Sequence, residues 1–237
     1  MPRPTLLLLH AFPFDARMWD GVGGPLRERG WDVLAPTLPV GAERRTMAEW
    51  AEDVFVIADG TLIPVGVSVG GYLSFELWRR APERVAALVL CDTRATPEPD
   101  EGMEGRARSI ETLRAGGPAA LWADMEDRVL GASADREVRG RAREIVLGRD
   151  PEELVATVEA IRDRPDSRET VGSISAPALV VVGEEDRFVP VADAAALATA
   201  LPEGRLRVVP AAGHVPPLER PEAFTAILSA FLEEVTA

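Results

Sequence analysis

The chain has 237 residues and a mean hydropathy of +0.01, as expected of a folded globular protein that buries its own core without disulfide or metal support. Its formal net charge of −13 argues against nucleic acid or an anionic membrane surface as a partner. Cys91 is the only cysteine, and the apolar run near the start is too short for a signal peptide or a membrane span, so we expect a cytoplasmic protein.

Apolar runs typical of strands buried on both faces alternate with helix-like segments over the first 94 residues. The predicted strands cover residues 5–9, 31–35, 62–67 and 85–91, and the predicted helices cover 18–29, 47–58 and 72–80. Pro64 has no N–H group for a ladder, so we expect it to be the first residue of its strand. Alternation at this spacing predicts an α/β fold with a doubly wound, mostly parallel sheet.

This rhythm changes after residue 94. Residues 95–170 contain no strand-like run, and four helices rich in Arg and Glu are predicted at 104–115, 118–130, 136–147 and 151–162. The alternation then resumes with strands at 178–182 and 206–209 and helices at 192–201 and 222–235. We therefore expect an α/β core formed by residues 1–94 and 171–237, with residues 95–170 inserted as a helical lid over the strand ends.

The segment Gly66-Val67-Ser68-Val69-Gly70 stands between a predicted strand and a predicted helix, which is the setting of a nucleophile elbow. A serine in such a turn has a strained backbone that lifts its hydroxyl clear of the sheet. Side chains two residues before and after would collide, which explains glycine at both places. The N-terminus of the next helix favours negative charge that develops at the site. Ser68 is therefore the candidate nucleophile.

A serine nucleophile needs a base that accepts its proton and a carboxylate that orients this base. The chain has two histidines, His10 after the first predicted strand and His214 after the last. Asp186 follows the strand at 178–182. The order Ser68, Asp186, His214 matches the triad order of α/β-hydrolases and neither of the two serine-protease orders. Asp92, after the strand that follows the elbow, is an alternative carboxylate.

The chain resembles small lidded α/β-hydrolases, close to the carboxylesterase and 3-oxoadipate enol-lactonase-like group. The resemblance is carried by residues 9–13 with 18–19, 66–71, 85–93, 183–190 and 213–214. It implies an oxyanion hole formed by the backbone N–H groups of Phe12 and Val69, and a loop-shaping role for His10. The family commonly has His-Gly where this chain has His10-Ala11, and the added methyl group removes no N–H group.

Four apolar residues are candidates for the substrate pocket: Trp122, Met125, Val189 and Val215. For Trp122 and Met125 on the lid, packing within the lid is the alternative interpretation. The sequence has no His-Glu-x-x-His motif, no paired cysteines, no phosphate-binding loop and no dinucleotide fingerprint. We therefore expect neither a metal nor a cofactor.

These features predict a serine hydrolase that cleaves a small carboxylic ester or lactone through an acyl-enzyme. Perhydrolysis without a cofactor, thioester hydrolysis and carbon–carbon bond hydrolysis would use the same triad. A ligand receptor that keeps the fold is the alternative outside the enzymes. Turnover of a chromogenic ester, and its loss in Ser68→Ala, separates these two classes.

Overall fold

The computed structural model of the protein describes residues 3–39 and 46–236 and contains one six-stranded sheet, in the order β2–β1–β3–β4–β5–β6. All neighbouring strands are parallel. The strands are β1 (Thr5–Leu9), β2 (Val33–Leu34), β3 (Leu62–Val67), β4 (Leu88–Cys91), β5 (Ala178–Gly183) and β6 (Gly204–Val209). The four central strands β1, β3, β4 and β5 are almost entirely buried, as their continuous apolar runs predict.

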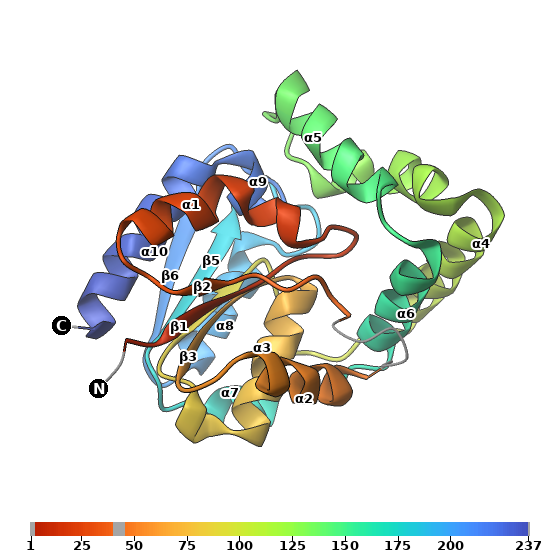
Figure 1. Cartoon of the computed structure of the whole chain (residues 1–237). Helices are drawn as coiled ribbons and strands as arrows, with labels where there is room; N and C mark the ends of the chain where they lie inside the picture. The colour runs from red at the N-terminus through yellow and green to blue at the C-terminus, as the bar shows by residue number, and fades with distance from the viewer. Residues whose placement is uncertain (1–2, 40–45, 237) are drawn as a thin grey trace.

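Helices cover both faces of the sheet (Figure 1). One face carries α1 (Asp20–Glu28), the short α9 (Pro216–Glu219) and α10 (Pro221–Thr236). The other face carries α2 (Met47–Ile57), α3 (Val69–Arg80), α7 (Arg168–Ser173) and α8 (Val191–Ala200). Short 3-10 helices cover Ala16–Trp19 and Pro82–Arg84. The prediction of a doubly wound parallel sheet is thereby confirmed.

Residues 92–177, between β4 and β5, contain helices and no strand. Three of them, α4 (Asp100–Val129), α5 (Arg136–Leu147) and α6 (Pro151–Arg162), stand together beside the sheet rather than on one of its faces (Figure 1). We call these three the inserted helices. The predicted ranges of α5 and α6 are confirmed. The two helices predicted at 104–115 and 118–130 correspond to the two parts of α4, which are separated by non-helical backbone at Gly117 (φ 65°) before Pro118.

The prediction for Pro64 is wrong, because Pro64 lies inside β3 opposite Leu7 of β1. On the other side of β3, continuous pairing with β4 begins only at Val65, and a single isolated bridge joins Leu62 to Val85 before it. The β3–β4 ladder is thus interrupted where the missing N–H group of Pro64 would have been needed. A central strand tolerates proline here because the neighbouring strand starts late.

The direction of winding changes at β1, which has β2 on one side and β3 on the other. In parallel sheets of this kind, loops leave such a switch point in opposite directions and open a crevice at the carboxyl ends of the strands. Phe12 follows β1 and Ser68 follows β3, so both lie at this crevice. The topology therefore gives a physical reason for a ligand site beside Ser68.

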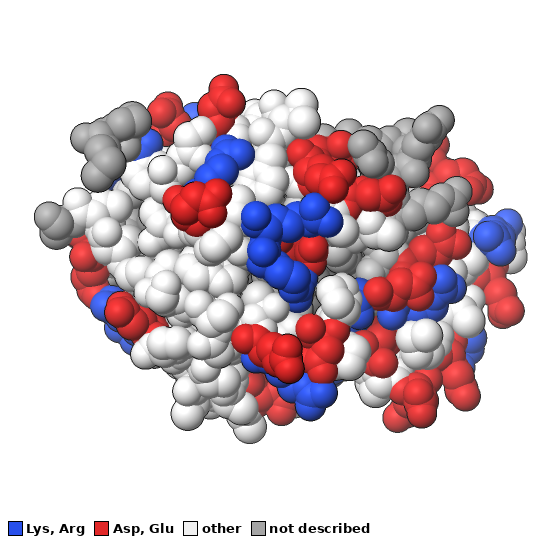
Figure 2. Space-filling model, turned by 90° about the horizontal axis from the view of Figure 1, so that it is seen from below, with Lys and Arg blue, Asp and Glu red and all other residues white. Residues whose placement is uncertain are grey.

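The surface shows no extended region of a single sign on the side seen from below, where Arg side chains lie among Asp and Glu side chains (Figure 2). Across the described ranges, no helix is both long and apolar enough to span a bilayer.

Arg149, directly after α5, connects the inserted helices to the sheet edge. It is buried, and its guanidinium donates hydrogen bonds to the carbonyl oxygens of Phe14 and Leu38. Glu153 lies 3.2 Å from the same guanidinium and balances its charge. Phe14 belongs to the loop that also contains Phe12, so Arg149 fixes that loop from the outside.

We expect Arg149→Met to lower the free energy of unfolding by about 3 kcal/mol, because two carbonyl oxygens lose a charged donor. Urea unfolding followed by circular dichroism measures this loss. Arg141→Met is the matched control: Arg141 pairs with Asp20 and Glu144 at the surface, and exposed pairs contribute less than about 1 kcal/mol. Equal effects of the two substitutions would contradict the anchoring role of Arg149.

Candidate active site

Ser68 lies between the end of β3 and the start of α3 with φ 54° and ψ −110°, in the left-handed region that a non-glycine residue rarely adopts. Its neighbours hold this conformation. The Ser68 N–H group donates to the carbonyl oxygen of Cys91 at 2.9 Å, and its carbonyl oxygen accepts a hydrogen bond from the Thr93 hydroxyl at 2.8 Å. The sequence analysis missed Thr93, which stands two residues after β4 and has no motif of its own.

Two glycines make the turn sterically possible. A Cβ atom on Gly66 would lie 2.3 Å from the carbonyl carbon and oxygen of Gly70, and a Cβ atom on Gly70 would lie 2.3 Å from the carbonyl oxygen of Leu9. Both contacts are with backbone atoms, which cannot rotate away. The turn after β3 is therefore packed directly against the end of β1.

His214 and Asp186, from the loops after β6 and β5, lie side by side. His214 Nδ1 is 2.8 Å from Asp186 Oδ2, and both side chains are buried. The second carboxylate oxygen, Oδ1, accepts the N–H group of Phe188 at 2.7 Å. The Phe188 ring also contacts the imidazole, with 4.8 Å between ring centroids. These contacts hold the imidazole through Nδ1. Its Nε2 atom has no hydrogen-bond partner among the described residues.

The pKa of Asp186 is held below its ordinary value. Burial alone would raise it, but attraction to His214 and hydrogen bonds from His214, Asp92 and the Phe188 N–H group lower it further than burial raises it. Asp186 is therefore ionised at neutral pH, as a carboxylate that orients an imidazole must be.

Asp92, the alternative carboxylate, lies behind Asp186. It is 1% exposed, and its Oδ1 accepts the N–H group of Gly183 at 2.9 Å. Burial, followed by repulsion from Asp186 and a hydrogen bond to it, raises the pKa of Asp92 well above the usual range. The surroundings of Asp92 thus favour its protonated form, while Asp186 is the carboxylate that contacts the imidazole.

Asp92, Asp186 and His214 also form a compact set of potential metal ligands, with one ligand atom from each lying within 4.8 Å of the others. In the structure these atoms form hydrogen bonds instead. His214 Nδ1 is engaged by Asp186, and the Oδ1 atoms of Asp186 and Asp92 accept the backbone N–H groups of Phe188 and Gly183.

His10 is buried away from this pair. Its Nε2 accepts the N–H group of Leu38 at 2.7 Å, and its Nδ1 lies 3.0 Å from the carbonyl oxygen of Ala11, to which it donates. Burial and repulsion from Arg149 lower the pKa of His10 to about 3. His10 therefore stays neutral in the physiological range and joins the loops after β1 and β2.

Glu219 fixes the loop that carries His214. Its carboxylate accepts backbone N–H groups of Gly131, Gly213 and Val215 at 2.8 to 3.2 Å. Gly131 follows α4, so this one side chain also joins the inserted helices to the His214 loop. The sequence offered a weak signal, since Glu219 is an acid within a short Pro-rich run after His214.

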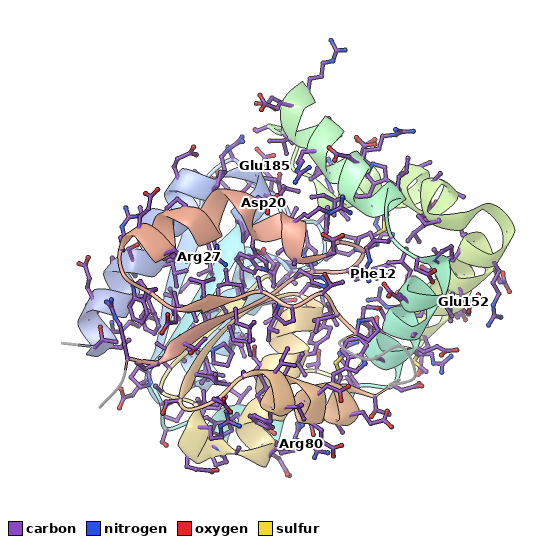
Figure 3. All side chains as sticks on the ribbon, in the orientation of Figure 1. Phe12, Asp20, Arg27, Arg80, Glu152 and Glu185 are labelled. Atoms are coloured by element: carbon purple, nitrogen blue, oxygen red, sulfur yellow. The ribbon has the colours of Figure 1, made fainter. Side chains whose placement is uncertain are left out.

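A cavity of about 510 Å³ opens at the carboxyl ends of the strands, and both Ser68 and His214 line it. Phe12, Met125 and Val189 line it as well. Figure 3 shows Phe12 in the loop after β1, on the side of the sheet that faces α6. The volume lies within the range of small-molecule sites.

Two of the four residues predicted for the pocket lie elsewhere, which corrects the sequence prediction. Trp122 is 2% exposed and packs edge-on against Phe14, with 5.8 Å between ring centroids. Val215 is fully buried in the core. The bend of α4 at Gly117 changes the direction of its second half, and a pattern of apolar residues does not reveal where such a bend directs each side chain.

The backbone N–H groups of Phe12 and Val69 have no acceptor within residues 3–39 and 46–236. Val69 is the first residue of α3, where an N–H group has no partner within the helix. Unsatisfied buried donors are rare in folded proteins. Two of them beside Ser68 are therefore available to a ligand oxygen.

Comparison with known proteins agrees with this architecture. Residues 6–227 match the model of the alpha/beta hydrolase family. A pimeloyl-[acyl-carrier protein] methyl ester esterase of Nitrosomonas europaea is 31% identical, with 96% of this chain and 95% of the relative covered. A solved thermophilic esterase from Thermogutta terrifontis, with malate bound, superposes with a TM-score of 0.93 at 32% identity, covering 99% of this chain and 91% of that one.

The enol-lactonase from Burkholderia xenovorans LB400 is a further structural neighbour, with a TM-score of 0.80, 25% identity, and coverage of 98% of this chain and 92% of that one. Each of these three matches covers at least 96% of this chain. The chain belongs to the alpha/beta hydrolase family.

Proposed function

We propose that this protein is a carboxylic ester hydrolase that cleaves a small ester or lactone through an acyl-enzyme on Ser68. One observation carries the proposal: Ser68 and His214 line one cavity while His214 Nδ1 lies 2.8 Å from Asp186. The names of the relatives support the reaction class, since they are esterases and an enol-lactonase.

In the proposed mechanism, Ser68 Oγ attacks the carbonyl carbon as His214 Nε2 accepts its proton. The same imidazole then gives the proton to the leaving alkoxide, and the acyl group stays on Ser68. Asp186 stabilises the imidazolium and keeps Nδ1 protonated. A water molecule, deprotonated by His214, releases the acid in the second half of the reaction. A lactone follows the same steps and opens to a hydroxy acid.

The oxyanion that forms at each step is assigned to the N–H groups of Phe12 and Val69. Their lack of other acceptors supports this role, because donors that are already oriented need not reorganise as charge develops. The N-terminus of α3 adds a favourable dipole at the same place. Such a site typically contributes about 3 to 4 kcal/mol per donor to the lowering of the barrier.

We propose further that residues 95–170 act as a lid on a core formed by residues 1–94 and 171–237. Met125 of α4 lines the same cavity as Ser68 and His214, which supports this division. On this basis the inserted helices shape the pocket and leave the chemistry to the loops at the strand ends. A series of p-nitrophenyl esters of increasing acyl length, run beside enol-lactones and short aryl lactones, tests the reaction class.

Ser68 is expected to be the only serine that a fluorophosphonate labels, because it stands in the strained turn before α3 and shares the cavity with the imidazole of His214. Ser109, which also lines the cavity, lies within α4. Intact-mass and peptide analysis should show one adduct on the peptide with Ser68. Ser68→Ala should lose both the adduct and ester turnover. An adduct on another serine, or full turnover in Ser68→Ala, would sink the assignment.

The rate on a small ester should rise with pH between about 5 and 8, where histidines titrate, because only a neutral imidazole accepts the serine proton. His214→Ala should lose this turnover. His10 is already neutral in this range, so a folded His10→Ala variant should keep the rise. Initial rates measured across the pH range decide whether His214 or His10 is the base. A rate that still rises with pH in His214→Ala would assign the base to His10.

Asp186→Asn is expected to lower kcat by about 10⁴, the loss found when a serine-protease triad carboxylate becomes an amide, or about 5.5 kcal/mol of barrier. Asp92→Asn should cost less than about tenfold, because an amide replaces a neutral acid that donates a hydrogen bond. Steady-state kinetics on one ester compares the two. The opposite ranking would place the triad acid on the loop after β4.

The protonation of Asp92 has its own readout in the same variant. When folding raises the pKa of a carboxyl, the free energy of unfolding of the protein falls as pH rises above the pKa of that carboxyl in the unfolded chain, about 3.9 for Asp. Relative to Asp92→Asn, the wild-type protein should therefore lose up to about 1.4 kcal/mol of unfolding free energy per pH unit above pH 4 while Asp92 stays protonated. A difference that does not vary with pH would show that Asp92 is ionised in the folded protein.

A further inference from the structure

The cavity beside Ser68 has more positive than negative side chains, although the whole chain carries a net charge of −13. Its wall includes Arg94, Arg106, Arg108, Arg128, Arg164 and Arg187, against Glu98, Glu101 and Asp124. Most of these groups come from α4 and from the loops after β4 and β5. The charge of the cavity is therefore opposite in sign to that of the protein.

Two of these arginines form ion pairs with a carboxylate of the same cavity wall. Glu98 is mostly buried and pairs with Arg164 and, at 3.4 Å, with Arg106. Arg164 also donates to the carbonyl oxygen of Thr96 and stacks over the Tyr72 ring at 4.3 Å. These contacts make the Glu98 cluster a structural element of the pocket wall.

Three other arginines of the wall have no carboxylate partner within the described ranges: Arg94, Arg128 and Arg187. Arg94 donates to the carbonyl oxygen of Phe188. Arg128 lies over the Phe188 ring, with 4.6 Å between its guanidinium carbon and the ring centroid. Arg187 forms neither an ion pair nor a hydrogen bond to a described residue. Arg94 and Arg128 thus contact Phe188, the residue whose ring contacts the imidazole of His214, and Arg187 precedes Phe188 in the chain.

On the outer surface of the inserted helices, Arg139 pairs with Glu126, Arg141 with Glu144 and Arg162 with Asp163. Arg114, Arg136 and Arg143 of the same helices form no ion pair with a described residue. Arginines without a carboxylate partner thus occur both inside and outside the cavity. Glu101 and Asp124 are exposed residues of α4, and Arg108, Arg128 and Arg187 are exposed as well. The excess of positive charge follows from the numbers on the wall, six arginines against three carboxylates.

A guanidinium presents paired donors that match a carboxylate, and a concave site strengthens the attraction. A neutral ester offers nothing for such donors to bind. We propose that the substrate is an ester or lactone that also carries a carboxylate, which Arg128 and Arg187 bind beside the reacting carbonyl. This inference rests on the proposed ester hydrolysis and specifies its substrate class.

The carboxylate can belong to the acyl part or to the alcohol part, and two matched pairs distinguish these sources. One pair is the monomethyl ester of adipic acid and the methyl ester with a terminal carboxamide in place of the acid. The other is 4-acetoxybutanoate and its carboxamide. Each pair differs in one charge and hardly in shape. The expected result is a kcat/KM at least roughly tenfold higher for the carboxylate in one pair, as charge-assisted hydrogen bonds imply.

Arg128→Gln and Arg187→Gln should each reduce this ratio several-fold, and the double variant should bring it close to one. Arg128→Lys keeps the charge and should retain more of the preference than Arg128→Gln. Arg207→Gln is the matched control: it removes one positive charge from β6, away from the cavity, and should leave the ratio as it is.

Ratios near one in both pairs, with turnover of the esters intact, would overturn the carboxylate site and spare the proposed hydrolysis. Absence of turnover together with no fluorophosphonate label on Ser68 would overturn the hydrolysis instead. Binding of adipate gives a readout without turnover. Isothermal titration should detect it in Ser68→Ala and lose it when Arg128→Gln and Arg187→Gln are added, and equal binding of adipamide would count against the site.

Discussion

The candidate active site depends on one steric constraint, the direct backbone contact between the turn after β3 and the end of β1. Gly66 and Gly70 have no room for a Cβ atom, and Gly70 meets the carbonyl oxygen of Leu9. Because β1 continues into the loop with Phe12, this contact sets the position of that loop relative to Ser68. The turn that contains Ser68 and the loop that contains Phe12 are thereby fixed relative to each other by close contact of the main chain.

Buried polar groups then hold the loops that the sheet alone leaves free. Glu219 binds three backbone N–H groups around His214, and Arg149 binds two carbonyl oxygens around the Phe12 loop. Burial and the neighbouring Asp186 raise the pKa of Asp92, which disfavours a second buried negative charge next to Asp186. A buried carboxylate without a partner would destabilise the fold. Here Glu219 accepts hydrogen bonds from backbone N–H groups, and the raised pKa of Asp92 favours its neutral form.

Much of this was accessible from the sequence, because local patterns report strongly constrained backbone. The strands β1 and β3 and the helices α5 and α6 were predicted at the residues where they occur. The Gly-x-Ser-x-Gly segment marked a turn that only glycine permits. Pro64 was misplaced because its tolerance depends on where a neighbouring strand begins, a property that no local pattern contains. For Trp122 the sequence left two interpretations open, and the structure agrees with packing, since the side chain is buried against Phe14 and does not line the cavity.

The Phe188 ring lies between a guanidinium of α4 and the imidazole of His214. A shift of α4 that moves Arg128 therefore changes how the Phe188 ring packs against the imidazole of His214. Side chains that touch one another do not respond independently to substitution. Efforts to broaden selectivity by changing α4 will consequently meet epistasis with the loops at the strand ends, and the two regions are better varied together than in turn.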